Sequence, residues 1–346
     1  MKRVESDQPV GAPVGAGGLL GKLQARNADG LWISAGLRRL SRNQGISMLV
    51  ILGVMWVALG LLSPYFFTVD NILEITLQTA VIAVIAAGQT LVILSGGIDL
   101  SVGAVFAASG VVGGLVFQST GNFMLSMTAT LAFGALLGLT NGLLISILRL
   151  PPFIATLGMM GVARGLALIL SGGVPIYGLD DRYKFIGQGK LFDIIPVPTI
   201  IVLVIFILGY IIVNYSRFGR FIYAIGSNPE AARLSGIKVS RVTIGVYLIC
   251  GFLCGLASTI EGGRLGIVQP AGGSGYELLA IGAVVIGGAS LFGGEGSIVA
   301  TLIGAIIVTT IRNGLNILGV NAFWQYVVNG TVIIIAVAID QYRRRQ

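Results

Sequence analysis

Long apolar runs separated by short polar connections fill most of the chain after about residue 45. A run of roughly 17–25 apolar residues is long enough to cross a bilayer as a helix, whereas Gly and Pro mark runs that need not cross fully. We therefore expect an all-α polytopic membrane protein with about ten transmembrane or membrane-embedded helices. The expected segments are 46–62, 76–95, 100–118, 123–148, 153–171, 197–214, 242–260, 275–291, 296–311 and 321–340.

The first 45 residues differ from the rest because they are polar and basic, with Gly, Ala and Pro interspersed. Segments of this kind bury too little apolar surface to fold. We expect residues 1–45 to form a disordered cytoplasmic extension and residues 46–346 to form a single transmembrane domain. The first apolar run starts near Ile46, too late for a cleaved signal peptide.

The composition supports a membrane protein and excludes several classes of enzyme. Hydrophobic residues make up 55% of the chain and charged residues 10%, whereas about a quarter of the residues of soluble proteins are charged. The absence of histidine removes His-based triads, metal sites and proton relays. Cys250 and Cys254 are too few for a metal cluster and are read as small packing residues. No Gly-x₄-Gly-Lys-Ser/Thr phosphate loop occurs, so the chain should not bind ATP by that route. We expect no catalytic residue, metal or cofactor in this chain.

The distribution of lysine and arginine predicts which side of the membrane each connection faces. One set of connections holds 16 of the 22 basic residues and the other holds five, with Arg164 intramembrane. This bias predicts that both termini and the loop 215–241 are cytoplasmic. The first set comprises Lys2, Arg3, Lys22, Arg26, Arg38, Arg39, Arg42, Arg149, Arg217, Arg220, Arg233, Lys238, Arg241 and Arg343–Arg345. The second set comprises Arg182, Lys184, Lys190, Arg264 and Arg312. Because the basic charge follows the membrane topology, we expect lipid contact and no nucleic-acid partner.

Glycines recur at every fourth residue in three apolar segments, where they predict closely packed helix faces and not ligand sites. The three patterns are Gly134-x₃-Gly138-x₃-Gly142, Gly161-x₃-Gly165 and Gly251-x₃-Gly255.

The segment Asn228–Gly236, Asn-Pro-Glu-Ala-Ala-Arg-Leu-Ser-Gly, carries the signals of a short helix. Asn228 suits the N-cap and Pro229 the first helical position. The charges of Glu230 and Arg233 complement the two ends of the helix dipole, and Gly236 can stop the helix. Because about two turns of helix do not persist alone in water, we expect a docking element on the cytoplasmic side.

Residues 95–103, Ser-Gly-Gly-Ile-Asp-Leu-Ser-Val-Gly, lie between two apolar runs and have two interpretations. In the first, a tight Gly turn places Asp99 or Ser101 as a cap of the next helix. In the second, a broken helix and the Asp99 carboxylate line a polar cavity, as in many transporters. The cap is favoured because a carboxylate near the membrane interface costs little.

Two further charged residues favour structural roles. Ser274 and Glu277 have capping-box spacing, so Glu277 is expected to cap a helix and not to bind a substrate. Arg164 lies about eleven residues into its run, roughly 16 Å deep, and is expected to pair with a carboxylate or a helix C-terminus. Neutral groups in the membrane suit either a polyhydroxylated solute or helix–helix hydrogen bonds. These groups include Gln89, Asn141, Asn313 and Asn316.

Few charged residues lie within the apolar runs, and no acidic ladder is present for proton coupling. We therefore expect another protein to supply the energy for transport.

Six motifs follow one another along the chain: Leu94-Ser-Gly-Gly-Ile-Asp-Leu-Ser-Val-Gly103, Phe153-Ile-Ala-Thr-Leu157, Arg217-Phe-Gly-Arg-Phe-Ile-Tyr-Ala-Ile-Gly226, Glu230-Ala-Ala-Arg-Leu-Ser-Gly-Ile237, Gln269-Pro-Ala-Gly-Gly-Ser-Gly-Tyr-Glu277 and Gly287-Gly-Ala-Ser-Leu-Phe-Gly-Gly294. With these motifs in this order, the chain from about Ile46 to its C-terminus resembles the permease subunit of bacterial carbohydrate ABC importers, in particular the ribose permease group.

The resemblance implies a non-catalytic, multi-pass permease of the bacterial inner membrane that moves a monosaccharide, with a ribose-like pentose expected. It also implies three partners: a second copy of the chain, a cytoplasmic ABC ATPase that binds the ATP, and a periplasmic sugar-binding protein. The element that would couple to the ATPase comprises Asn228, Pro229, Glu230, Ala231, Ala232, Arg233, Leu234, Ser235 and Gly236. In this hypothesis Ala231, Ala232 and Leu234 form its packing face against the ATPase.

An alternative hypothesis is an ion-coupled secondary sugar transporter or facilitator that acts alone. Many such transporters contain internal repeats, and no convincing repeat is present in this sequence. A membrane-embedded enzyme is a third hypothesis, which lacks a recognisable nucleophile–base pair or cofactor motif.

Overall fold

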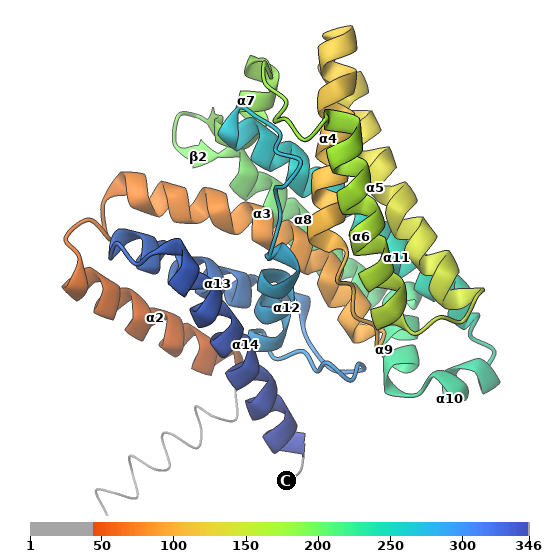
Figure 1. Cartoon of the computed structure of the whole chain (residues 1–346). Helices are drawn as coiled ribbons and strands as arrows, with labels where there is room; N and C mark the ends of the chain where they lie inside the picture. Colours follow the sequence, from red (N-terminus) through yellow and green to blue (C-terminus); the bar gives the residue numbers. More distant parts are fainter. Residues whose placement is uncertain (1–43, 345–346) are drawn as a thin grey trace, which may run out of the picture. The chain divides into compact units, whose positions relative to one another are not determined.

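The computed structural model describes residues 44–344, which are predominantly helical (Figure 1). The chain divides into two units, Met1–Ser47 and Met48–Gln346. Of the first unit only residues 44–47 are described, so the predicted extension lies almost wholly outside the described residues. The account below concerns the second unit.

Within the described residues, eight helices are long and apolar enough to cross a membrane, and each matches an expected run. They are α2 (Gln44–Leu62), α3 (Val69–Leu94), α4 (Val102–Thr120), α5 (Phe123–Ser146), α6 (Pro152–Ser171), α8 (Val197–Tyr215), α11 (Val239–Leu265) and α13 (Ile298–Ile317). The all-α polytopic fold class is thereby confirmed. The other two expected segments are α12 (Tyr276–Ile286) and α14 (Ala322–Arg344). With 11 residues, α12 extends for roughly 16 Å and is too short to span a bilayer.

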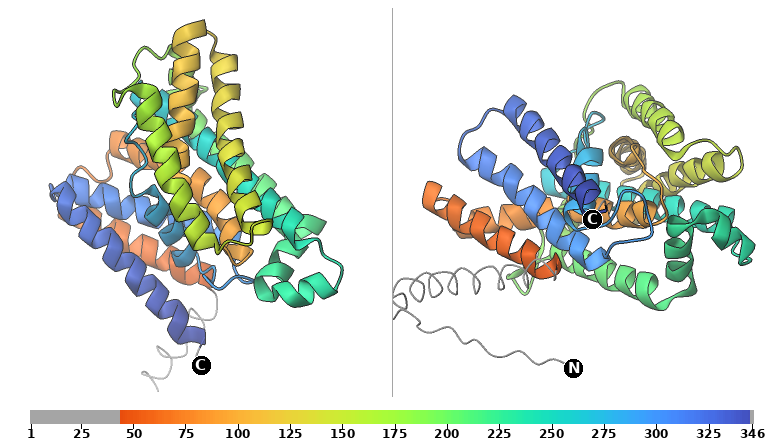
Figure 2. Two further views of the ribbon diagram at one scale, coloured as in Figure 1. Left: turned by 45° about the vertical axis from the view of Figure 1, so that its right-hand side comes forward. Right: turned by 90° about the horizontal axis from the view of Figure 1, so that it is seen from below.

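Short elements occupy the two ends of the helix bundle (Figures 1 and 2). Helix α7 (Asp181–Gln188) and the two-stranded hairpin of β1 (Lys190–Leu191) and β2 (Ile195–Pro196) connect α6 with α8. Helices α9 (Arg217–Ser227) and α10 (Pro229–Leu234) connect α8 with α11. We refer to these two ends as the α7 end and the α10 end.

Helix α7 is attached to the bundle by Tyr183, which is buried between Phe117 and Phe123. The Tyr183 hydroxyl also forms a hydrogen bond with Ser126 of α5. Burial raises the pKa of Tyr183.

Helices α3 and α11 form the centre of the bundle, and glycine brings α11 close to α5. A Cβ atom added at Gly138 would lie 3.0 Å from the Cα of Gly251, so this contact requires glycine. The predicted packing faces of α5 and α11 are thus confirmed, and Cys250 and Cys254 are buried free thiols, as expected. The prediction for Gly161-x₃-Gly165 is wrong within this chain, because a Cβ at either glycine would meet nothing within 4 Å.

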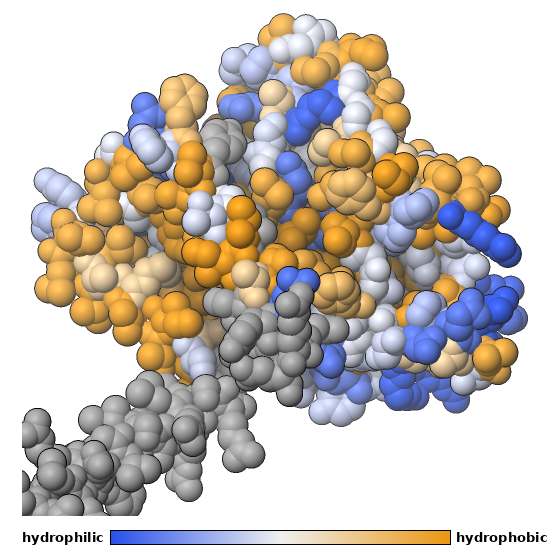
Figure 3. Space-filling model, turned by 60° about the horizontal axis from the view of Figure 1, so that its bottom comes forward, coloured by the Kyte–Doolittle hydropathy of each residue, from blue (hydrophilic) through white to orange (hydrophobic). Residues whose placement is uncertain are grey.

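Polar surface gathers where α9 and α10 lie, whereas apolar residues cover much of the adjacent surface (Figure 3). The exposed charged side chains at this end include Arg217, Arg220, Glu230, Arg233, Lys238 and Arg241. On the sides of the bundle, α2 exposes large apolar residues such as Val54 and Leu61, as expected for helices that face lipid.

Candidate functional site

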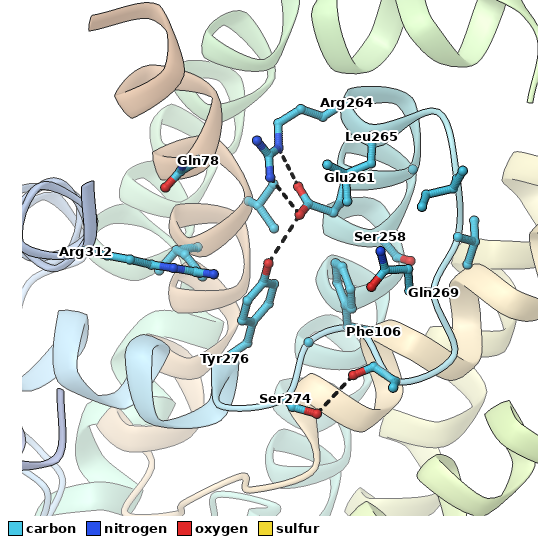
Figure 4. A pocket seen from close by; sticks show the side chains of 18 of the residues that line it. Gln78, Phe106, Ser258, Glu261, Arg264, Leu265, Gln269, Ser274, Tyr276 and Arg312 are labelled. Carbon is cyan, nitrogen blue, oxygen red and sulfur yellow. Dashed lines mark hydrogen bonds and ion pairs between the residues drawn. The ribbon is translucent and has the colours of Figure 1, made fainter. Parts of the chain in front are cut away.

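A polar cavity of about 370 Å³ lies among the helices of the bundle (Figure 4). It is bounded by α3, α4, α11, α12, α13 and the non-helical segment 266–275. The polar side chains that line it are Gln78, Ser258, Glu261, Arg264, Gln269, Ser274, Tyr276, Arg312 and Asn316. We call it the polar cavity.

Arg264 and two carboxylates form an ion-pair cluster at the wall of the polar cavity. The Arg264 Nε lies 2.8 Å from Glu261 Oε2, and its Nη1 lies 2.7 Å from Glu74 Oε1. Because the side chains of Arg264 and Glu261 are only 16% and 11% exposed, each charge depends on the other for compensation. The cluster joins α3 to α11 across 190 residues of sequence.

Tyr276 and Arg312 extend this cluster across the cavity. The Tyr276 hydroxyl donates to Glu261 Oε1 at 3.3 Å, and the Arg312 guanidinium lies over the Tyr276 ring, 5.9 Å from its centroid. Gln78 Nε2 donates to Glu74 Oε1 at 2.7 Å, whereas the buried Gln78 Oε1 has no hydrogen-bond partner. Arg264 and Arg312 were expected in outer connections, but they lie within α11 and α13, because both helices extend beyond the expected runs 242–260 and 296–311.

Arg164 stabilises the non-helical wall of the polar cavity. Its Nη1 donates to the carbonyl oxygens of Pro270 at 2.9 Å and Gly272 at 2.8 Å. The predicted intramembrane partner was a carboxylate or a helix C-terminus, but the hydrogen-bond partners are carbonyls of an unwound segment. Irregular backbone at this depth requires such donors, because lipid offers none.

Glu277 accepts a hydrogen bond from the backbone N–H of Gly275, the residue before α12, at 3.2 Å. The predicted capping role of Glu277 is thus supported, but the reciprocal capping box is wrong. Ser274 does not cap α12; its hydroxyl donates to the carbonyl of Ala271 at 3.0 Å.

Asp99 lies in the buried turn between α3 and α4, where it acts as a local structural acceptor. Its Oδ1 accepts from the Ser101 N–H at 2.8 Å and from the Ser101 hydroxyl at 2.6 Å, and Asn141 Nδ2 donates to the same hydroxyl at 2.9 Å. Burial raises the pKa of Asp99, and the hydrogen bonds of Ser101 and Asn141 oppose this rise. The turn interpretation is supported, although Ser101 itself makes no side-chain cap.

The remaining neutral candidates do not converge on one site. Asn316 lines the polar cavity and accepts from Gln325, whereas Asn313 donates to Asn71 of α3 at 2.8 Å. Gln89 is fully buried, has no hydrogen-bond partner and is not among the residues that line the polar cavity.

Helix α10 has the predicted signals of a short helix. Asn228 Oδ1 accepts from the Ala231 N–H at 3.0 Å, Glu230 and Arg233 form a 2.8 Å ion pair, and Gly236 has a φ of 83°. Leu234 is 83% exposed. Ala232, however, is only 4% exposed and packs against the chain itself, so its assignment to an outward packing face is wrong.

Close backbone contacts join the end of α9, directly before α10, to the bundle. A Cβ atom at Gly226 would lie 2.5 Å from the backbone nitrogen of Gly294 and closer still to the carbonyl oxygen of Leu94. The same Gly294 N–H donates to the Leu94 carbonyl at 3.0 Å. We call these contacts the α9 junction; they connect α10 to the end of α3.

Gln78 and Glu261 of the polar cavity, and Glu74 beside it, were not predicted as site residues from the sequence. Glu74 and Gln78 have no local motif that indicates a site. The i,i+3 spacing of Glu261 and Arg264 in an apolar run was the one signal that could have found the cluster.

The sequence matches a family model described as "Branched-chain amino acid transport system / permease component" over residues 71–337. The chain is 43% identical to the ribose import permease of Escherichia coli strain K12 over 303 residues, which cover 86% of this chain and 93% of that protein. It is 45% identical to the ribose import permease of Bacillus subtilis strain 168 over 308 residues, covering 88% and 93%. The D-allose transport system permease of E. coli strain K12 is 40% identical over 294 residues, covering 84% and 90%. No solved structure matches the chain significantly.

Proposed function

Because the chain belongs to the branched-chain amino acid transport system / permease component family, we propose that it is the membrane subunit of an ATP-driven importer of a monosaccharide. It is a multi-pass protein of the bacterial inner membrane. The names of the relatives, which specify ribose and D-allose, favour a neutral monosaccharide, with D-ribose as the first candidate.

The observation that carries the ATP-driven part of the proposal is the exposed helix α10. Leu234 is an apolar side chain that is 83% exposed, next to the exposed ion pair of Glu230 and Arg233. An exposed apolar anchor with a charged rim is typical of a protein–protein interface. We propose that α10 faces the cytoplasm and docks on a separate ABC ATPase, which binds the ATP.

The α9 junction supplies a route from this docking element into the membrane. Movement of α10 displaces Gly226, and the backbone contacts of Gly226 with Leu94 and Gly294 leave little free space to absorb the displacement. In this proposal the displacement of α10 moves α3 and the segment 290–296. As a result, a dimer of two copies of the chain alternates between a state open to the periplasm and a state open to the cytoplasm. A periplasmic sugar-binding protein delivers the sugar at the α7 end.

Leu234→Ser tests the docking proposal without disturbing the buried core, because Leu234 contacts solvent in the isolated chain. Loss of a buried leucine at an interface costs about 1.5–3 kcal/mol, so we expect the affinity for the ATPase to fall about tenfold or more. The measurement is co-purification of the two subunits together with ATP-dependent sugar uptake in proteoliposomes.

Two matched variants complete this experiment. Leu234→Met retains an apolar side chain and should retain ATPase binding. Leu148→Ser changes a 62% exposed leucine in the α5–α6 connection, also at the α10 end, and should bind the ATPase normally. Wild-type ATPase affinity and uptake in Leu234→Ser would refute the role of α10.

A further inference from the structure

The polar cavity contains hydrogen-bonding groups that the chain itself leaves unused. Gln78 Oε1 is a buried acceptor without a partner, and an unsatisfied buried polar atom is costly. Arg312 forms none of the ion pairs found among the described residues, and its guanidinium points into the cavity over Tyr276 (Figure 4). A partnerless acceptor, and a guanidinium whose N–H donors outnumber its contacts with Tyr276, fit a ligand whose hydroxyls both donate and accept.

The charges around the polar cavity favour an uncharged ligand. Glu261, Arg264 and Arg312 line it, and Glu74 completes the ion pairs of Arg264. Two carboxylates and two guanidinium groups sum to zero charge. A ligand with a phosphate or carboxylate would give the cavity a net negative charge and lie close to the Glu261 carboxylate, whereas a neutral ligand preserves the charge balance.

The walls of the polar cavity also fit a small ring-shaped solute. Its volume of about 370 Å³ is within the range of roughly 300–1,000 Å³ for small-molecule sites. Phe106 and Tyr276, with ring centroids 5.3 Å apart, supply an apolar surface for C–H groups beside the polar groups. The wall formed by residues 266–275 is unwound and precedes the half-length helix α12, an arrangement that often surrounds substrates in membrane transporters.

From these observations we infer that the polar cavity of a single subunit binds a neutral monosaccharide, with Gln78 Oε1 accepting from one sugar hydroxyl and Arg312 donating to another. This inference rests on the proposed function for the class of ligand. It adds a defined sugar site within each subunit, in contrast to passage along a surface between two copies.

The test is equilibrium binding of radiolabelled D-ribose to the complex of permease and ATPase in nanodiscs, without the binding protein. Gln78→Leu removes the acceptor, and Arg312→Met removes the donor while keeping most of the side-chain length. Each variant should weaken D-ribose binding by about tenfold, the effect of one lost hydrogen bond of about 1.4 kcal/mol. Unlabelled D-ribose should displace the label, whereas D-ribose 5-phosphate should not.

Gln89→Leu is the matched control, because Gln89, like Gln78, is a glutamine of α3 whose side-chain oxygen has no partner, but it lies outside the polar cavity. It should bind D-ribose like the wild type. Thermal unfolding and ATPase co-purification identify any variant that fails to fold, and Gln78→Asn, which keeps an amide, then replaces Gln78→Leu. The inference is overturned if Gln78→Leu and Arg312→Met bind D-ribose like the wild type, if Gln89→Leu alone loses binding, or if D-ribose 5-phosphate binds more tightly than D-ribose.

The same preparation separates this inference from the proposed function. If uptake requires ATP while the cavity variants bind and transport normally, the sugar site is wrong and the importer assignment stands. If uptake occurs without ATP hydrolysis, the importer assignment fails, whatever the cavity binds.

Discussion

Gly226→Ala tests whether the α9 junction transmits motion between α10 and the membrane helices. The new methyl carbon would lie 2.5 Å from the backbone nitrogen of Gly294 and 3.0 Å from the carbonyl carbon of Leu94. Ordinary carbon contacts are about 3.5–4.0 Å long, and neither neighbour is a flexible side chain that can rotate away. The backbone segments must therefore separate by several tenths of an ångström or more.

The energetic cost of that separation can be bounded. Overpacking by one methyl group typically costs about 1–3 kcal/mol, and weakening the Gly294 N–H to Leu94 C=O hydrogen bond adds about 1 kcal/mol. The higher helix propensity of alanine offsets about 0.8–1 kcal/mol of this destabilisation. We therefore expect a net destabilisation of about 1–3 kcal/mol and a looser link between α10 and α3.

Two assays measure the effect of Gly226→Ala: thermal unfolding of the purified permease, and the ratio of sugar imported to ATP hydrolysed in proteoliposomes. Gly226→Ala should unfold at a lower temperature and import less sugar per ATP, while the ATPase still binds because α10 is unchanged. Gly158→Ala in α6 is the control, since a Cβ there meets nothing within 4 Å. Wild-type values for Gly226→Ala in both assays would refute the tight junction and the route through it.

Two further predictions concern the walls of the polar cavity. Arg164→Met removes two charged hydrogen bonds to the segment 266–275, so the backbone amides of that segment should exchange with deuterium about tenfold faster or more. Arg182→Met, which changes a 68% exposed side chain, should leave their exchange unchanged. Equal exchange in both variants would contradict the role of Arg164. Glu261→Gln breaks a buried ion pair and should lower the free energy of unfolding by about 3 kcal/mol. Glu74→Gln changes a 41% exposed carboxylate and should lower it by about 1 kcal/mol or less. Chemical or thermal unfolding measures both. The reverse order would mean that Arg264 depends mainly on Glu74.

The membrane helices were predictable because hydrophobic length is a local property. Each of the ten expected segments corresponds to a helix, and even α10 could be predicted from Asn228, Pro229 and Gly236, which act on their nearest neighbours. The direction of burial was less predictable. Ala232 is buried and Leu234 exposed because α10 packs on α9 and α11, and no local signal in nine residues records that contact.

The polar cavity depends on contacts that the sequence does not reveal. From the sequence, a capping turn was favoured at Asp99 and a broken helix there was the second interpretation. The half-length helix α12 instead follows the unwound segment 266–275. Glu74 and Arg264 come together only when α3 and α11 pack, although they are 190 residues apart. Arg264 and Arg312 therefore counted as loop charges in the sequence, while the fold makes them walls of a cavity.

The most direct test of the central claim is D-ribose uptake into proteoliposomes that contain this chain with its ABC ATPase and sugar-binding protein. The account predicts uptake only with hydrolysable ATP, and none when the ATPase is omitted or an ion gradient is supplied in its place. Sugar flux by this chain alone, with or without an ion gradient, would contradict the account and favour a secondary transporter or facilitator.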